Sequence, residues 1–231
     1  MRINKFLAQN TQYSRRAGDE LISQGRVKIN QTVAKLGSEV GDGDKIYLDN
    51  EEVANKSSQA TTIIIFNKPI GYVCSRNGQG NKTIYDILPN KYHNLNPVGR
   101  LDKDSSGLLL LTDNGQLANQ LTHPKYQKTK VYEVNLDKPL QPLHQQMISD
   151  YGVSLEDGIS KFVIIKTGLT NKDYHYQVTM QEGRNRQIRR TFIALGYKVI
   201  KLHRTHFGQY TLGNLQPSKS KLTDSSVTDQ R

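Results

Sequence analysis

The sequence predicts an α+β protein with two domains: a small domain of helices and strands, followed by a larger domain built on a mixed, largely antiparallel β-sheet with flanking helices. Three observations lead to this prediction. The stretch at residues 54–60 is polar, lacks hydrophobic periodicity and indicates a flexible linker. Short β-prone runs bounded by Gly, Pro, Asn or Asp dominate the chain beyond it. Few of these runs are joined by a single helix of crossover length, which disfavours a doubly wound parallel sheet.

These patterns also predict the domain boundaries. We place the first domain at residues 1–56 and the second at residues 61–217. The remaining residues, 218–231, are polar enough that we expect a disordered tail. A chain of 231 residues can form a sizeable hydrophobic core in the larger domain.

Two helices are predicted at the start of the first domain. Ile3, Phe6 and Leu7 recur at positions i, i+3 and i+4, which is the spacing of a short amphipathic helix. Ser14 is a candidate N-cap for a second helix, and Gly25 can end that helix.

Basic side chains are concentrated in the second helix and in the strand that follows it. Arg15 and Arg16 fall in the first turn of the helix, where the helix dipole disfavours cations. A phosphate bound there would gain from both arginines and from the helix N-terminus. Arg26 and Lys28 alternate with apolar residues along the next predicted strand. The pattern is a modest indication of contact with nucleic acid.

The predicted strands are short and are bounded by turn-forming residues. They comprise residues 26–30 and 45–48 in the first domain, and residues 62–66, 108–112, 131–136, 162–166 and 175–180 in the second. Two helices interrupt the strands of the second domain. One follows an Asp-Asn-Gly turn and runs through Leu117 and Leu121, and the other runs from about residue 186 to Leu195 and ends at Gly196.

Composition restricts the partner and the compartment. The chain carries 32 Lys and Arg against 21 Asp and Glu, a net charge of +11, which favours a polyanion such as nucleic acid as the partner. No apolar stretch approaches the ~18 residues of a membrane span, and no apolar signal segment is present at the N-terminus. We therefore expect a cytoplasmic protein with no membrane partner. The single cysteine, Cys74, predicts a buried apolar residue without a disulfide or a metal.

One motif is more informative than the rest of the chain. Residues 99–107, Gly-Arg-Leu-Asp-Lys-Asp-Ser-Ser-Gly, form a charged, hydroxyl-rich turn that leads directly into four leucines. A strand that is apolar on both faces is buried in a sheet, so Asp102 is placed at the edge of a packed core. On spacing alone, a carboxylate here more often caps a turn than takes part in chemistry.

The motif is one of an ordered series of segments. The series comprises residues 67–71, 99–112, 121–124, 130–132, 152–158 and 182–190. In this order the segments resemble the pseudouridine synthases, in particular the ribosomal RNA enzymes of the RsuA/RluB type. Residues 14–16 and 25–27 resemble the alpha-L RNA-binding module of ribosomal protein S-four. The resemblance covers residues 1 to about 215, and Ser105 stands where the family more often has Thr.

The resemblance implies a reaction and its essential residue. Pseudouridine formation breaks the bond between ribose and uracil N1, turns the base and rejoins it through C5, with no redox change and no group donor. By resemblance, Asp102 is the essential carboxylate, and no cofactor or metal is needed. Whether Asp102 attacks the base at C6 or acts at the sugar is left open. A uridine inside an RNA helix must first be flipped out.

Three further side chains are implied around the flipped base. Tyr132 corresponds to the active-site tyrosine, although a strand Tyr packed on a sheet is equally typical. Arg189 corresponds to the basic residue that pairs with Asp102 and keeps it ionised, and its place beside the apolar helix face fits a buried arginine that needs an acidic partner. Leu202 corresponds to an apolar residue of the uracil pocket, and could equally be core.

The other basic residues are assigned to RNA. The complete set of RNA-binding candidates is Arg15, Arg16, Arg26, Lys28, Lys68, Arg100, Lys130, Arg184, Arg186 and Arg190, together with Leu202 at the uracil pocket. Arg186 and Arg190 are four residues apart, so we expect them to face phosphates from one side of the predicted helix. A solvated basic face is the alternative. Arg100 either holds the loop or inserts towards the RNA.

Two functions remain open. One is an isomerase acting on a specific uridine of ribosomal RNA, with the large-subunit (RluB) type favoured over the small-subunit (RsuA) type. The other is a non-catalytic RNA-binding protein of ribosome assembly, and only the isomerase requires Asp102, Tyr132 and Arg189 to converge. A hydrolytic triad is disfavoured because Ser105 and Ser106 lack a nearby His. We expect a monomer whose partner is ribosomal RNA, either free or in an assembly intermediate.

Overall fold

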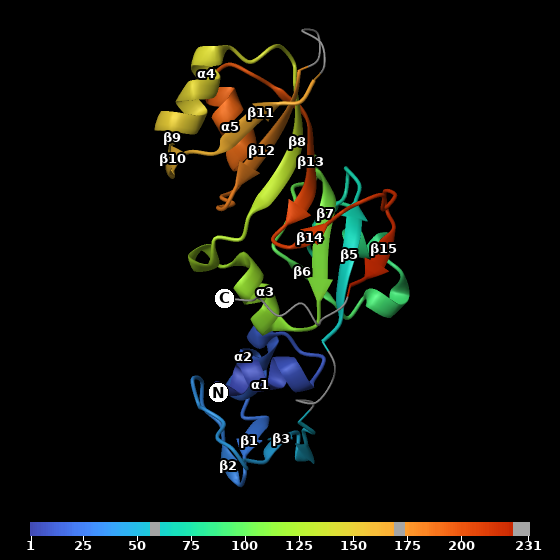
Figure 1. Cartoon of the computed structure of the whole chain (residues 1–231). Helices are drawn as coiled ribbons and strands as arrows, with labels where there is room; N and C mark the ends of the chain where they lie inside the picture. Colours follow the sequence, from blue (N-terminus) through green and yellow to red (C-terminus); the bar gives the residue numbers. More distant parts are fainter. Residues whose placement is uncertain (56–60, 169–173, 224–231) are drawn as a thin grey trace. The chain divides into compact units, whose positions relative to one another are not determined.

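The computed structural model describes residues 1–55, 61–168 and 174–223. The chain divides into two compact units, residues 1–60 and 61–231 (Figure 1). Each unit has its own hydrophobic core. Most of the expected linker, residues 56–60, lies outside the described residues.

The N-terminal unit combines two helices with a four-stranded antiparallel sheet. Its elements are α1 (Ile3–Asn10), α2 (Arg15–Ser23), β1 (Val27–Ile29), β2 (Thr32–Val33), β3 (Ile46–Leu48) and β4 (Glu51–Glu52), with strand order β2-β1-β3-β4. Ile3, Phe6 and Leu7 are buried, as their helical spacing predicts. Ser14 caps α2, because its Oγ accepts a hydrogen bond of 3.1 Å from the backbone N of Ala17.

The C-terminal unit is built on a nine-stranded sheet. Its strands are β5 (Ile63–Lys68), β6 (Asn96–Val98), β7 (Ser106–Thr112), β8 (Lys130–Leu136), β11 (Val163–Lys166), β12 (His175–Met180), β13 (Val199–Phe207), β14 (Tyr210–Thr211) and β15 (Ser220–Leu222). The main order is β11-β12-β8-β13-β7-β5-β15, while β14 pairs with β13 and β6 with β7. Each of these pairs is antiparallel except β13–β7. The predicted mixed, largely antiparallel sheet is confirmed.

Helices and a separate hairpin flank this sheet (Figure 1). They are α3 (Gly115–Thr122), α4 (Pro142–Gln146), α5 (Gln187–Ala194) and the antiparallel pair β9 (Val153–Leu155) and β10 (Gly158–Ser160). Four shorter helical turns are η1 (Ile84–Asp86), η2 (Asn90–Tyr92), η3 (Pro124–Tyr126) and η4 (Met147–Tyr151). Across the described ranges, the structure holds no helix of the length and apolar character that a membrane span requires.

The parallel pair β13–β7 is the seam between two antiparallel parts of the sheet. Its register pairs His203 with Ser106 and Arg204 with Gly107. Gly107 has a φ of +104°, and a Cβ atom there would lie 2.2 Å from the carbonyl oxygen of Arg204. Only glycine allows the two strands to approach this closely. The charged segment 99–105 therefore lies immediately before the seam.

Several elements were not predicted, among them β6, β14, α4 and the β9–β10 hairpin, and two further differences concern β13 and the tail. The nine-residue central strand β13 was missed, because its basic and polar residues interrupt the apolar pattern. The expected disorder of the tail is wrong for residues 220–222, which form β15 and pair with β5. The free edge of β5 offers unpaired backbone groups, and a polar strand can satisfy them without burying its side chains. Residues 224–231 of the expected tail lie outside the described residues.

Candidate active site

The loop between β6 and β7 presents Asp102 at the surface of the core. The Asp102 side chain is 30% exposed, whereas the preceding Leu101 is buried in the main core of the C-terminal unit. The backbone N of Ser105 donates to the carbonyl oxygen of Asp102 at 3.1 Å and closes the loop on itself. The position of Asp102 directly before a buried strand agrees with the sequence.

Lys68, at the end of β5, is a buried cation beneath this loop. Its Nζ donates to the carbonyl oxygens of Pro69 at 3.0 Å, Asp102 at 3.0 Å and Ser105 at 2.8 Å. Burial lowers the pKa of Lys68, while the neighbouring acidic groups oppose that shift. The predicted contact of Lys68 with RNA is wrong, because its ammonium group is inside the protein. It fixes the backbone that carries Asp102.

Cys74 packs behind the same loop. Its Sγ donates to the carbonyl oxygen of Leu101 at 3.3 Å and accepts from the backbone N of Leu101 at 3.4 Å. Burial raises the pKa of the thiol. The buried position expected for Cys74 is confirmed, and its sulfur also helps to hold the residue before Asp102.

Arg189, on α5, is buried as predicted, but its acidic partner is Asp104. Its Nε lies 3.3 Å from Asp104 Oδ2, and its Nη2 donates to the carbonyl oxygen of Asp104 at 2.7 Å. Its Nη1 donates to the carbonyl oxygen of Val199 at 2.9 Å. Desolvation lowers the pKa of Arg189, and the Asp104 charge opposes this. The predicted direct pair between Arg189 and Asp102 is therefore wrong: Arg189 ties the loop to β13.

Arg186 is the cation that reaches Asp102. Its Nη1 lies 3.7 Å from Asp102 Oδ2, and its two terminal nitrogens donate to the Asp104 carboxylate at 2.9 Å and 3.0 Å. The hydrogen bond from Arg186 lowers the pKa of Asp104. Arg186 has a φ of +48° and precedes α5. It therefore does not share a helical face with Arg190, contrary to the prediction.

Tyr132 and Leu202 belong to the same core cluster as Leu101. Tyr132 lies on β8 opposite Arg204 of β13, and Leu202 lies two residues earlier on β13. Both side chains are buried. The two strands thus bring Tyr132 and Leu202 into the core that lies behind Leu101. Among the described residues there is no hydrogen bond between Tyr132 and Asp102, so contact of Tyr132 with the reacting base stays a prediction.

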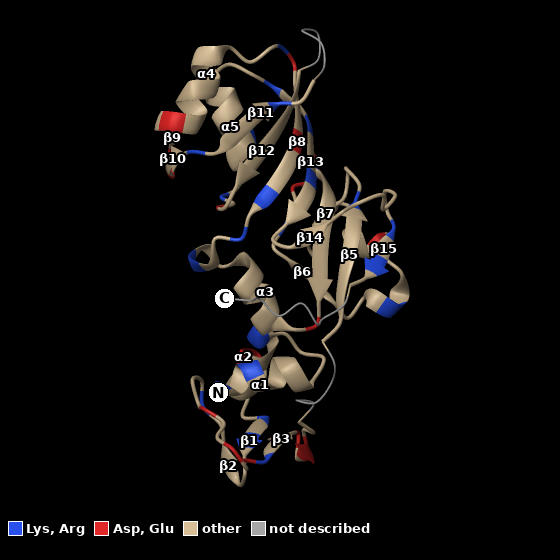
Figure 2. Ribbon diagram, in the orientation of Figure 1, with Lys and Arg blue, Asp and Glu red and all other residues tan. Residues whose placement is uncertain are grey.

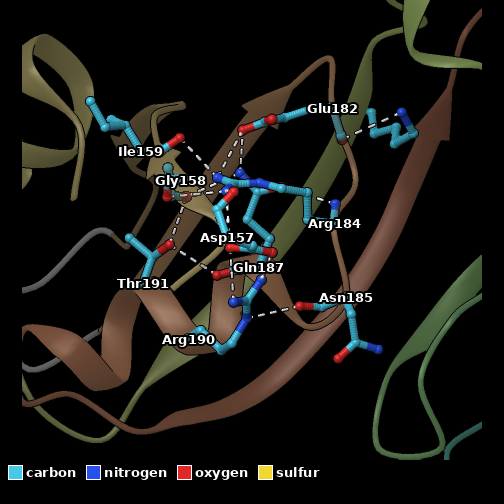
Figure 3. Close-up of polar contacts among 11 residues, drawn as sticks. Asp157, Gly158, Ile159, Glu182, Arg184, Asn185, Gln187, Arg190 and Thr191 are labelled. Carbon is cyan, nitrogen blue, oxygen red and sulfur yellow. Dashed lines mark hydrogen bonds and ion pairs between the residues drawn. The ribbon is translucent and has the colours of Figure 1, made fainter. Parts of the chain in front are cut away.

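The phosphate contacts predicted for Arg184 and Arg190 are occupied by protein. Arg190 donates to the two carboxylate oxygens of Asp157 at 2.9 Å and 2.6 Å, and Arg184 donates to one of them at 3.0 Å (Figure 3). Both arginines therefore bind the β9–β10 hairpin. Contact of Arg184 and Arg190 with phosphates stays a prediction, and in this structure Asp157 is their acidic partner.

Lys130 is also turned into the protein. Its Nζ donates to the carbonyl oxygens of Lys128 at 3.2 Å and Gln181 at 2.9 Å. Burial, with a smaller contribution from Arg204, lowers the pKa of Lys130 to about 8. These contacts join the start of β8 to the end of β12, and contact of Lys130 with RNA stays a prediction.

The basic candidates of the N-terminal unit have different surroundings. Arg15 and Arg16 are exposed at the start of α2. Arg26 is paired with Asp49 through two hydrogen bonds of 2.8 Å and 2.6 Å, and Lys28 donates to Asn50 at 2.9 Å. Arg100, in the C-terminal unit, is exposed. Lys and Arg are spread over both units (Figure 2). Arg26 is exposed as well, but its guanidinium is already paired with Asp49.

A histidine lies closer to the motif than the sequence indicated. His203 Nδ1 and Ser106 Oγ share a hydrogen bond of 2.9 Å across the seam. Burial lowers the pKa of His203. The expectation that Ser106 lacks a nearby His is therefore wrong, because β13 was not predicted. Within the described residues no carboxylate hydrogen-bonds to His203, so the arrangement is not a hydrolytic triad.

An open pocket of about 470 Å³ adjoins the loop on the Asp104 side. It is lined by Asp104, Arg186 and Arg189 and by the apolar side chains of Ile193, Val199 and Ile200, among others. Its volume is in the range of small-ligand sites. In the ranges that the structure describes, no group of three or more His, Cys, Asp or Glu is arranged to hold a metal ion.

Comparison with known proteins finds matches to both units of the chain. A family model described as RNA pseudouridylate synthase matches residues 62–194, and the S4 domain model matches residues 1–46. The chain is 34% identical over 225 residues to "Ribosomal large subunit pseudouridine synthase B" of Bacillus subtilis, covering 95% of this chain and 91% of that protein. It is 38% identical over 219 residues to the protein of the same name from Xanthomonas campestris, covering 91% of this chain and 44% of that protein.

Two further similarities concern length and structure. The chain spans less than half the length of several of the curated relatives it matches, between 40% and 46% for four of them. A solved structure titled "Crystal structure of pseudouridylate synthase" superposes with a TM-score of 0.69 at 31% identity, covering 98% of this chain and 97% of that one. The similarity therefore covers both units described above.

Proposed function

The chain belongs to the RNA pseudouridylate synthase family, and from this premise we propose that it converts a specific uridine of ribosomal RNA to pseudouridine. Several relatives bear the name ribosomal large subunit pseudouridine synthase B, which supports large-subunit RNA as the substrate in preference to small-subunit RNA. The N-terminal S4 domain, with Arg15 and Arg16 exposed, supports RNA as the partner. Because ribosomal RNA is the proposed substrate and the relatives are bacterial, we place the protein in the cytoplasm.

The observation that best supports the reaction is the state of the Asp102 carboxylate. Lys68 and Arg189 fix the backbone of the loop that carries Asp102. The carboxylate oxygens of Asp102 nevertheless accept no hydrogen bond among the described residues. A carboxylate that attacks a carbon atom needs free lone pairs and a fixed position. Asp102 has both. A protein that only binds RNA has no need for this arrangement.

The residues around Asp102 match the demands of an isomerisation. The N1–C1′ bond breaks, a C5–C1′ bond forms, the proton leaves C5 and a proton is gained at N1, so no external reagent is consumed. Arg186 Nη1 lies 3.7 Å from Asp102 Oδ2 and places a positive charge beside the carboxylate. We propose that Tyr132 accepts the C5 proton and that Leu202 packs against the base. Attack at C6 and action at the sugar both remain consistent with this set.

The function is tested with ribosomal RNA transcribed in vitro, which lacks modifications. The protein in excess should form pseudouridine at one position of the large-subunit RNA in a single-turnover assay, and base-resolution mapping would identify the position. Small-subunit RNA, assayed in parallel, should stay unmodified. Binding of large-subunit RNA with no pseudouridine in either RNA would overturn the proposal and favour the non-catalytic assembly protein.

A further inference from the structure

The β9–β10 hairpin is bound by the segment that leads into α5 (Figure 3). The guanidinium of Arg184 donates to three successive carbonyl oxygens of the hairpin turn, those of Asp157 at 2.8 Å, Gly158 at 3.1 Å and Ile159 at 2.8 Å. A second connection runs from α5 itself, where Thr191 Oγ1 donates to Ser160 Oγ at 2.8 Å. The hairpin and the start of α5 therefore form one hydrogen-bonded body.

The Asp157 carboxylate is the centre of this body. It accepts a two-point contact from Arg190 at 2.9 Å and 2.6 Å and a further hydrogen bond from Arg184 at 3.0 Å. Paired contacts between a guanidinium and a carboxylate fix both distance and orientation. The hydrogen bond from Arg190 lowers the pKa of Asp157, so the carboxylate is charged at neutral pH.

Arg190 carries this constraint to the backbone beside the active site. Its Nε donates to the carbonyl oxygen of Asn185 at 2.9 Å, while its terminal nitrogens hold Asp157. The Asn185 carbonyl belongs to the peptide bond that precedes Arg186. Asp157 is therefore connected to the Arg186 backbone through a single side chain.

The backbone of Arg186 needs such support. Its φ of +48° and ψ of +29° place it in the left-handed region, which residues other than glycine rarely adopt. A conformation of this kind persists only where the surroundings determine it, and it is concentrated at functional sites. Here it turns the Arg186 guanidinium towards Asp104 and Asp102.

We propose that Asp157 is a positioning residue for Arg186: it holds Arg190 against the Asn185 carbonyl and so fixes the left-handed backbone that directs Arg186 to Asp102. Asp157 acts through other residues and does not touch the reacting atoms. The proposal rests on the proposed function, because the importance of Arg186 depends on chemistry at Asp102. The Asp157 and Arg190 side chains are 41% and 29% exposed, and ion pairs this exposed contribute little to global stability. The effect is local.

The first test does not depend on activity. Asp104 interacts with Arg186, Arg189 and Lys68, and it reports on Arg186 because the Arg186 hydrogen bond lowers the pKa of that carboxyl. Carbon-13 NMR titration of Asp104 in Asp157→Asn should show that pKa rising towards its usual range. Asp157→Glu, which keeps the charge, should restore the wild-type titration. The matched control is Glu156→Gln, the same loss of charge at an exposed neighbour.

The second test is kinetic and uses the full chain. Asp157→Asn should slow single-turnover conversion at saturating RNA by about tenfold, because a small displacement of a catalytic-site group has effects of this order or larger. In an Arg186→Ala background the same substitution should change the rate by less than about twofold, because residues that act through one another are not additive. Glu156→Gln should leave the rate unchanged.

The outcomes separate the two proposals. No pseudouridine from the wild-type protein would overturn the proposed function, while the Asp104 titration still decides the role of Asp157. An unchanged Asp104 titration in Asp157→Asn would overturn the positioning role. A rate loss of equal size with and without Arg186 would overturn it as well, and would leave Asp157 with a general structural role.

Discussion

Asp102 and Asp104 lie two residues apart in one loop and have opposite surroundings. The Asp104 carboxylate accepts two hydrogen bonds from Arg186 and has Arg189 at 3.3 Å, whereas the Asp102 carboxylate has only Arg186 at 3.7 Å as an ion-pair partner in the described part of the chain. Yet Asp104 is the more exposed of the two, at 47% against 30%. Exposure does not distinguish the proposed reactive group, Asp102, from the proposed supporting one, Asp104. Unused hydrogen-bonding capacity does.

The largest expected effect comes from removing the Asp102 carboxylate. Asp102→Asn should lower single-turnover conversion by about a thousandfold or more, because the amide cannot supply an anionic nucleophile or base. The free energy of unfolding should change by less than about 0.5 kcal/mol, since little is bonded to this side chain. RNA affinity should be retained. A folded Asp102→Asn protein that reacts at near the wild-type rate would contradict the assignment of Asp102.

The second effect separates the two cations that contact Asp104. Arg189→Ala should lower the free energy of unfolding by about 3 kcal/mol, because Arg189 is only 8% exposed and its removal breaks its hydrogen bonds to the Asp104 and Val199 carbonyls. Arg186→Ala should cost less than about 1 kcal/mol, as is usual for an exposed pair. Both should slow conversion. Urea unfolding and single-turnover rates measured on the same samples decide this, and equal losses of stability would refute the distinction.

The third effect comes from removing the charge of Asp104. Asp104→Asn should slow conversion by about tenfold at most, because the amide keeps an acceptor for Arg186 and Asp102 is untouched. Since contacts lower the pKa of Asp104 in the folded state, its contribution to stability is present above the usual Asp range and is lost as the pH falls through the lowered value. The stability difference between wild type and Asp104→Asn should therefore disappear in acid. A stability difference that grows as the pH falls would contradict the lowered pKa of Asp104.

The smallest effect concerns a cation held by carbonyl groups. Burial lowers the pKa of Lys130 to about 8, so between pH 8 and the usual Lys range the unfolded chain binds the extra proton. The free energy of unfolding of the wild type, minus that of Lys130→Met, should increase as the pH rises through this window. Urea titrations at pH 7, 8.5 and 10 measure the gain. A constant difference would show that Lys130 is solvated in the folded protein.

Much of the fold could be predicted where the signal is local. The cap at Ser14, the turn before α3 and five strands of the larger sheet follow from neighbouring residues. β13 and β15 could not be found in this way. β13 is central in the sheet but carries polar side chains, and β15 is a strand only because the edge of β5 is available.

The candidate site was predicted less completely. The motif identified Asp102, and the helical pattern identified Arg189 as buried. Which arginine contacts Asp102 could not be predicted. The positive φ of Arg186 turns this residue out of the regular helix, and the helical pattern gives no sign of it. The role of Lys68 as an RNA ligand was wrongly predicted for another reason: a net positive charge does not show which cations are buried. Distances between segments far apart in the chain decide both questions.

The seam between β7 and β13 has a consequence for how the protein folds during synthesis. Ser106 and His203 are 97 positions apart, and the Arg189 contact with the Asp104 carbonyl spans 85. Contacts of such long range form late in folding, because closing a long loop costs chain entropy before it gains any interaction. A nascent chain released only as far as α5 has Lys68 and Cys74 beside the Asp102 loop, but it lacks the β13 contacts of Ser106 with His203 and of Arg189 with Val199. We expect activity to begin only after β13 has left the ribosome.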